Sequence, residues 1–109
     1  MNIQIFGVKK CFDTKKAERY FKERRIKYQF IDLKLKALSK GELRSVRASV
    51  GIDNLVDTNA KNYLRFRSAS PDHQEELMLD DAGLYQTPIV RNGKQATVGY
   101  QPEVWKSWE

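Results

Sequence analysis

The residue best suited to covalent chemistry in this chain of 109 residues is Cys11, its single cysteine. One thiol can form no intrachain disulfide, and it cannot build a structural zinc site that needs several cysteines. In the segment CFDT, Thr14 stands where a CxxC motif carries its second thiol. Any adduct of Cys11 must therefore be resolved by a thiol from another molecule.

The positive charge of the chain is concentrated around this cysteine. The formal net charge is +6, and from Lys9 to Lys27 nine basic residues stand against three acidic ones, which accounts for all of it. Such surroundings favour a thiolate or attract an anionic partner, while the alternative is a solvated basic helix face without a role in chemistry. Under the first interpretation, Lys9 and Lys10 favour the thiolate or bind an anionic thiol partner.

Hydrophobic periodicity predicts the elements that position Cys11. Residues 2–6 and residues 28–33 alternate as two short strands. Between them a helix is expected, with Asp13 or Thr14 as its N-cap and an end near Arg24 and Arg25. Its buried stripe consists of Ala17, Tyr20 and Phe21. Cys11 then lies just ahead of the helix, where backbone N–H groups and the helix dipole favour the thiolate.

The middle of the chain is predicted to be helical. A capping-box pattern at Ser39 opens an amphipathic helix that stops at Gly51. Residues 52–67 are ambiguous, with two short helical segments as the favoured interpretation. Ser70-Pro71 is a cap followed by proline in the first helical position, and this helix is expected to run to about residue 82.

At the end of the chain the pattern returns to strands. Asn92-Gly93 stands between two short alternating segments and is typical of a two-residue type I′ hairpin. A last helix opens at Pro102, and three apolar residues share one of its faces: Val104, Trp105 and Trp108.

This order of elements predicts the fold class. The first two strands form a parallel pair, the last two form an antiparallel hairpin, and helices fill the segment between them. We expect one α/β domain over residues 1–109 with a thioredoxin-like fold, in which a four-stranded mixed sheet has flanking helices and a central helical insertion at about residues 37–84.

The dipeptide Thr87-Pro88 directly precedes the predicted hairpin. In thioredoxin-like folds a cis proline at this place lies against the reactive cysteine and presents backbone groups to the bound thiol or peptide. The alternative is an ordinary proline at the start of a strand, because only about one X-Pro bond in twenty is cis in folded proteins.

Three parts of the chain together resemble the ArsC/Spx family, the arsenate-reductase-like branch of the thioredoxin-like superfamily. They are the opening IQIFGVKKCFDTKKAERYF, the central helical segment and the closing TPIVRNGKQATVGYQPEVW. The resemblance implies that Cys11 is the nucleophile and Pro88 the cis proline. It also implies a thiol-dependent reductase whose cysteine is regenerated by glutathione or a glutaredoxin.

In the glutaredoxin-coupled arsenate reductases that the chain resembles, three arginines hold the oxyanion and the thiolate. This chain lacks all three. The matching places carry Asp57, Thr87 and the region of Tyr100 and Gln101, while Arg65, Arg67 and Arg91 do not match the pattern. Each missing charge-assisted contact is worth about 1.5 to 3 kcal/mol. We therefore expect weak or undetectable arsenate reduction.

Two hypotheses follow for the function. In the first, the protein is an enzyme in which Cys11 attacks an oxidised substrate, Thr14 caps the helix and bonds the sulfur, and Thr87 with Pro88 shapes the thiol-binding side. In the second, it is an Spx-like adaptor that contacts the transcription machinery or another protein, and Cys11 is a sensing or vestigial thiol.

The expected partners are few. We expect no bound cofactor and no metal site, with glutathione or a glutaredoxin as the external reductant. Nucleic acid is not an expected partner, because the chain has no aromatic stacking set and no second basic face. No run of about 18 apolar residues is present, and we expect a cytoplasmic monomer. His73, the only histidine, is expected at the surface.

Overall fold

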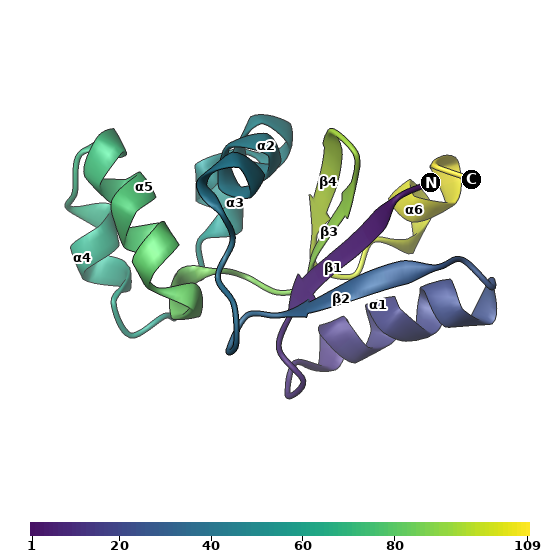
Figure 1. Ribbon diagram of the computed structural model, residues 1–109. Helices are drawn as coiled ribbons and strands as arrows, with labels where there is room; N and C mark the ends of the chain where they lie inside the picture. The colour runs from purple at the N-terminus through teal and green to yellow at the C-terminus, as the bar shows by residue number, and fades with distance from the viewer.

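Four strands form one mixed sheet in the order β2-β1-β3-β4 in the computed structural model, which describes residues 1–109 (Figure 1). The strands are β1 (Ile3–Gly7), β2 (Tyr28–Asp32), β3 (Ile89–Asn92) and β4 (Gln95–Val98). The β1–β2 pair is parallel, whereas β1–β3 and β3–β4 are antiparallel. The predicted α/β class with a mixed four-stranded sheet is confirmed.

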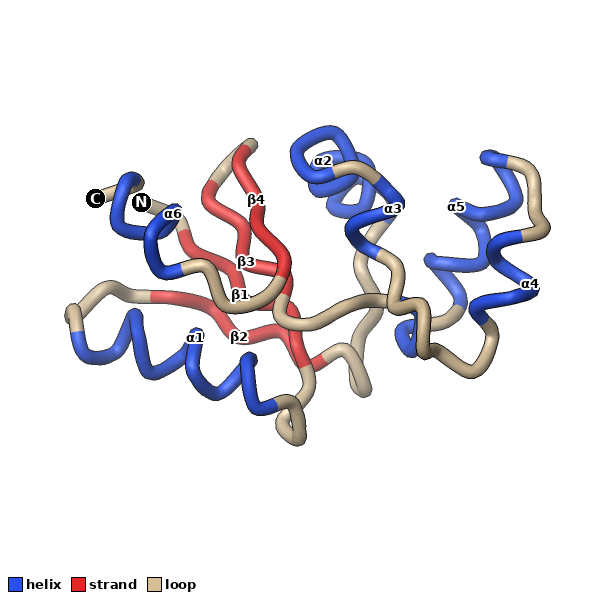
Figure 2. Tube along the Cα trace, turned by 180° about the vertical axis from the view of Figure 1, so that it is seen from behind, coloured by secondary structure: helices blue, strands red, loops and turns tan.

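Helices cover both faces of this sheet. The helices are α1 (Phe12–Glu23), α2 (Lys40–Val50), α3 (Ile52–Leu55), α4 (Tyr63–Arg67), α5 (Pro71–Asp80) and α6 (Pro102–Ser107), with a 3₁₀ turn η1 (Ala82–Leu84). Seen from two sides, α1 and α6 lie beside the sheet, while α4 and α5 form the far end of an elongated molecule of 42 × 26 × 22 Å (Figures 1 and 2). None of the helices combines the length and the apolar composition needed to cross a bilayer.

Two hydrophobic clusters pack the helices against the sheet. They are separate because successive side chains of a strand point to opposite faces of the sheet. One cluster joins the sheet to α1 and α6 and consists of Ile3, Ile5, Ala17, Tyr20, Phe21, Val90 and Trp105. The other contains 14 buried residues and joins Phe6 and Ile89 of the sheet to the helices α2 to α5. The aromatic residues predicted to pack in the core, Tyr20, Phe21 and Trp105, are buried in the first cluster.

The start of α1 differs from the prediction. Its N-cap is Cys11, and the expected Asp13 or Thr14 cap is wrong. The Cys11 carbonyl oxygen already accepts the first helical bond, from the N–H of Lys15 at 3.2 Å. Asp13 and Thr14 therefore lie in the first turn, where the Thr14 side chain is fully buried against Gly7. A Cβ atom on Gly7 would lie 2.6 Å from the Thr14 hydroxyl oxygen, so the strand can approach the helix this closely only with glycine.

The hairpin turn also differs from the prediction by one residue. Asn92 pairs with Gln95 in the ladder, so the loop is Gly93-Lys94 and not Asn92-Gly93. Only Gly93 has a positive φ, of 60°, whereas a type I′ turn needs two such residues. Asn92 stays in the strand because it pairs with Ile3 of β1 and its side-chain oxygen accepts the N–H of Asn2 at 3.2 Å.

The helical middle agrees closely with the sequence prediction. Ser39 makes both bonds of a capping box with Glu42 at the start of α2. The ambiguous segment forms the short helices α3 and α4, and α5 begins behind the Ser70 cap with Pro71 in its first turn. It ends at Asp80, two residues before the predicted end, because the Asp81 side chain accepts the N–H of Gly83 at 2.9 Å and starts the 3₁₀ turn.

The last helix shows the predicted face only in part. Trp105 is fully buried and Trp108 is partly buried, but Val104 is 39% exposed. The indole N–H of Trp105 donates to the hydroxyl of Thr97 at 2.8 Å, which ties α6 to β4.

Candidate active site

Cys11 lies where the end of β1 and the start of α1 meet the loop before β3. It is the N-cap residue of α1 and is partly exposed. Its Sγ–H donates to the backbone carbonyl oxygen of Thr87 at 3.6 Å, across 76 residues of sequence. The peptide bond between Thr87 and Pro88 is cis, as expected for a proline in this place. The fold thus brings the cysteine and the proline loop together.

The surroundings of Cys11 favour its ionised form. Partial burial raises the pKa of the thiol, but hydrogen bonds outweigh burial and hold the pKa below its ordinary value. The largest of these come from the side chains of Thr14 and Thr87, followed by the backbone N–H groups of Thr14 and Asp13. The two amides belong to the first turn of α1, whose N–H groups have no partner within the helix. The thiolate is therefore stabilised by two hydroxyls and one helix terminus.

The Thr14 hydroxyl has an additional reason to favour the thiolate. The side chain is fully buried, and the hydroxyl finds no hydrogen-bond acceptor elsewhere in the protein. An unpaired buried donor is costly, by about 1 to 3 kcal/mol. Ionisation of Cys11 supplies a strong acceptor next to it, so deprotonation of the thiol also relieves the cost of the unpaired hydroxyl.

The lysines before Cys11 are placed differently from the threonines. Lys9 and Lys10 are both exposed. Lys9 lines a cavity along β2, together with Phe30 and Leu35. The main contributions to the lowered pKa of Cys11 are hydrogen bonds and not lysine charges. A role of Lys9 and Lys10 in holding an anionic partner stays a prediction.

The sequence analysis missed Phe12 at this site, and it named Tyr100 only as standing in the region of a missing arginine. Phe12 follows Cys11 and is 69% exposed, and Tyr100 is 42% exposed. The Lys16 ammonium lies between them, 4.9 Å from the centre of the Phe12 ring and 5.2 Å from that of Tyr100. The spacing of four residues between Phe12 and Lys16 is a sequence signal for one helix face. No local signal brings Tyr100 to the same place.

Comparison with known proteins identifies the family. The sequence model of the ArsC family matches residues 6–108. The chain belongs to the ArsC family. It is 24% identical to the Bacillus subtilis protein YusI over 111 residues, covering 94% of each chain. It is 28% identical to global transcriptional regulator Spx 2 of Oceanobacillus iheyensis over 109 residues, covering 94% of this chain and 80% of the regulator.

The fold is that of an arsenate reductase of known structure. The arsenate reductase from Vibrio cholerae superposes with a TM-score of 0.85 at 21% identity, covering 98% of this chain and 97% of the reductase. At that level of identity the likeness establishes the fold, which is the thioredoxin-like fold of the ArsC/Spx group. The match to the ArsC family model confirms the family resemblance of the sequence.

Two arginines of this ArsC-family chain lie away from the cysteine. Arg91 donates to the Gly93 carbonyl oxygen and to the side-chain oxygen of Gln4, each at 3.0 Å. The register puts these residues at the hairpin end of the sheet, opposite to the end that carries Cys11. Arg65 lines a cavity with Asp80 and Asp81 at the far helices. Neither arginine is placed to hold an oxyanion at the thiolate.

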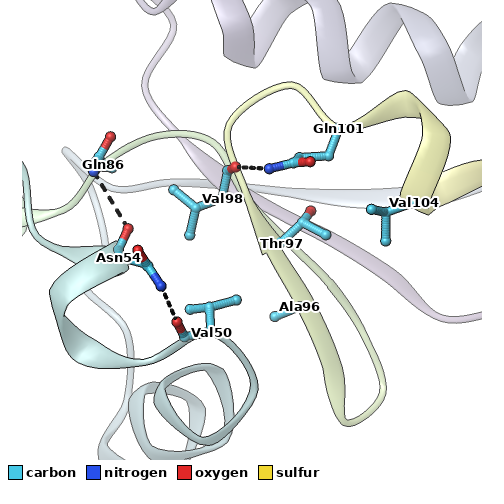
Figure 3. Close-up of a pocket in the computed structure, with 8 residues that line it drawn as sticks. All are labelled: Val50, Asn54, Gln86, Ala96, Thr97, Val98, Gln101 and Val104. Carbon is cyan, nitrogen blue, oxygen red and sulfur yellow. Dashed lines mark hydrogen bonds between the residues drawn. The ribbon is translucent and has the colours of Figure 1, made fainter.

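The largest cavity of the ArsC-family fold carries no nucleophile. It has a volume of about 580 Å³ and lies between α2–α3 and β4–α6 (Figure 3). Its walls are formed by apolar and neutral polar residues: Val50, Asn54, Gln86, Ala96, Thr97, Val98, Gln101 and Val104. The side-chain amides of Asn54, Gln86 and Gln101 donate to backbone carbonyl oxygens around it. With no titratable side chain, the cavity cannot supply acid, base or thiol chemistry.

A metal centre has no ligand set in this structure. No group of three or more His, Cys, Asp and Glu side chains lies close enough together to hold an ion. His73 is exposed and its Nδ1 lies 3.3 Å from Glu76 on the same helix, which is the surface position expected from the sequence.

Proposed function

We propose that this ArsC-family protein is a thiol-dependent oxidoreductase in which Cys11 is the nucleophile. The Cys11 thiolate attacks a sulfur of an oxidised substrate, a bond forms between the two sulfurs, and the second sulfur of the substrate leaves as a thiolate. Because the chain has no second cysteine, an external thiol such as glutathione or a glutaredoxin must attack the adduct and release Cys11.

One observation supports the proposal above all others. Cys11 caps α1 with a lowered pKa, and it faces the cis Thr87-Pro88 loop. A low-pKa, partly exposed thiol is the form that reacts with disulfides at neutral pH. In this proposal the hydroxyls of Thr14 and Thr87 hold the thiolate, and the backbone around Pro88 receives the thiol substrate.

Arsenate is a poor substrate in this proposal. A tetrahedral oxyanion with two charges needs several charge-assisted donors, and the places of the three arginines carry other residues. A disulfide needs only the thiolate and room for the leaving sulfur. We expect a coupled assay with arsenate, glutathione and glutaredoxin to give weak or undetectable turnover.

The rate of alkylation of Cys11 by iodoacetamide across pH tests the proposal. We expect the midpoint of the rate profile to lie below the ordinary thiol pKa of about 8.5. Incubation with oxidised glutathione followed by intact-mass measurement should show one glutathione adduct, which reduced glutaredoxin removes. A midpoint at the ordinary value together with no adduct would refute the proposal.

The similarity to Spx 2 supports a second candidate function. In this alternative the protein is a redox-sensing adaptor that binds the transcription machinery or another protein without turnover. A Cys11→Ser variant separates the two, because it abolishes activity in the first and retains binding of the partner in the second. For either function we propose a cytoplasmic monomer without a bound cofactor.

A further inference from the structure

The exposed rings of Phe12 and Tyr100 and the partly buried side chain of Lys16 form one surface near the start of α1, here called the aromatic clamp. The two rings lie 4.9 and 5.2 Å from the Lys16 ammonium. Phe12 and Tyr100 are the only aromatic side chains of the protein that are exposed. The two most exposed aromatic rings therefore both lie against one ammonium group, and one of them belongs to the residue next to Cys11.

Two elements that meet at Cys11 carry the clamp. Phe12 is the residue after Cys11 in α1. Tyr100 follows Gly99, whose N–H donates to the carbonyl oxygen of Pro88 at 2.8 Å. Lys16 lies five residues beyond Cys11, a rise of about 7.5 Å along the helix, and a helical side chain points back toward the N-terminus. The clamp thus begins at Phe12, the residue next to Cys11, within a few bonds of a group carried on the Cys11 sulfur.

The side chains around the clamp are mainly basic, and the ammonium of Lys16 has no acidic partner. None of the salt bridges of the protein involves Lys16. A cavity of about 220 Å³ next to it is lined by Lys16, Arg19, Tyr20, Glu23, Arg24 and Tyr100. Of its two arginines, Arg24 is paired with Glu109 at 3.7 Å. The clamp therefore offers an unpaired ammonium between two apolar ring faces, which suits a carboxylate on a short apolar stem.

We infer that the aromatic clamp binds the carboxylate end of a small disulfide while Cys11 attacks its sulfur. The inference rests on the proposed function and adds the substrate class, low-molecular-weight disulfides that carry a negative charge. The Cys11 thiolate forms the new S–S bond, the S–S bond of the substrate breaks, and the distal half leaves as a thiolate. Cys11 is oxidised to the mixed disulfide and the departing half is reduced, so no further reactant is needed for this step.

A matched series of three disulfides tests the inference. Dithiodipropionate, hydroxyethyl disulfide and cystamine share a two-carbon stem and end in a carboxylate, a hydroxyl and an ammonium group. The rate of mixed-disulfide formation at Cys11 is measured by intact mass, and each rate is divided by that of a free thiolate with the same disulfide. We expect the anionic probe to react about two- to fivefold faster than the neutral one, as for an exposed ion pair, and the cationic probe to react slowest.

Variants assign the preference to the clamp. Lys16→Gln should abolish the preference for dithiodipropionate and leave the rate with hydroxyethyl disulfide unchanged. Lys22→Gln removes the same charge from the last turn of α1 and should leave the preference intact. Tyr100→Leu should weaken the preference, because the ammonium loses one of its two rings.

The possible failures are distinguishable. Equal normalised rates for the three probes, or equal effects of Lys16→Gln and Lys22→Gln, would overturn the inference and leave the proposed function standing. A folded wild-type protein that forms no mixed disulfide with any of the probes would overturn the proposed function and the inference together.

Discussion

Replacing Thr14 by valine separates the chemical role of its hydroxyl from its role in packing. Valine has nearly the same shape, so the contact with Gly7 is retained while the donor to Cys11 is removed. We expect the pKa of Cys11 to rise in Thr14→Val. At a pH where Cys11 is a neutral thiol, the stability should be unchanged or slightly higher, because the buried hydroxyl then has no partner to lose. At a pH where Cys11 is ionised, the variant should be less stable than the wild type, because the thiolate loses one donor.

The size of the effect follows from the bond that is lost. A hydrogen bond to a charged group contributes about 1.5 to 3 kcal/mol. Cys11 is partly exposed, so water replaces part of the lost bond, and the appropriate value is about 1 to 1.5 kcal/mol. At about 1.4 kcal/mol for each factor of ten, the ratio of thiolate to thiol falls about five- to tenfold.

The alkylation rate of Cys11 against pH measures this change, and Thr97→Val is the matched control. Thr97 is also buried, but its hydroxyl accepts the indole N–H of Trp105 at 2.8 Å. Thr97→Val should therefore lower the melting temperature and leave the alkylation profile of Cys11 unchanged. The reasoning is refuted if Thr14→Val has the same alkylation profile as the wild type, or if the two variants show the same pattern.

Three further predictions concern the same end of the sheet and the helical middle. Gly7→Ala puts a Cβ atom 2.6 Å from the Thr14 side chain, so we expect a loss of about 1 to 3 kcal/mol in unfolding free energy and slower alkylation of Cys11 at neutral pH, measured by denaturant titration and mass spectrometry. The lowered pKa of Cys11 in the folded state makes the unfolded state bind more protons between the folded and unfolded pKa values, so stability should rise with pH through this window and be lost as pH falls through it to the folded pKa, and Cys11→Ser should lack this dependence. Ser39→Ala removes the acceptor of the Glu42 N–H and should lower the unfolding free energy by about 1 kcal/mol without changing the reactivity of the thiol.

The sequence was sufficient for features that depend on near neighbours. The alternation of β1 and the stripe of α1 are local patterns, and they placed Cys11 ahead of a helix. The position of Pro88 against Cys11 was expected from the thioredoxin-like fold and the family resemblance, and not from a local pattern. The capping box at Ser39 was equally clear, because both of its bonds join residues three apart.

Long-range contacts explain what the sequence did not reveal. Asn92 has the typical composition of a turn, but pairing with Ile3, 89 residues away, keeps it in the strand and moves the turn to Gly93-Lys94. Thr14 has the composition of an N-cap, but the buried space beside Gly7 takes its side chain into the first turn. Tyr100 meets Lys16 of α1 only because the chain after β4 returns to Pro88. For Asn92 and Thr14, tertiary packing overrides the local preference of the residue.

The position of Thr87 connects the pKa of the thiol with the choice of substrate. By resemblance, the reductases that act on arsenate carry an arginine here, whereas in this chain the side-chain hydroxyl of Thr87 helps to lower the pKa of Cys11. A hydroxyl stabilises one negative charge on the sulfur but cannot offer the two parallel N–H donors that an oxyanion needs. Cys11 can therefore be a nucleophile without the arginines, provided that the substrate brings a sulfur leaving group instead of a dianionic oxyanion. This is the reason to expect activity with disulfides and little with arsenate, and the two assays together decide whether the hydroxyls and the helix terminus make the thiol reactive without the arginines.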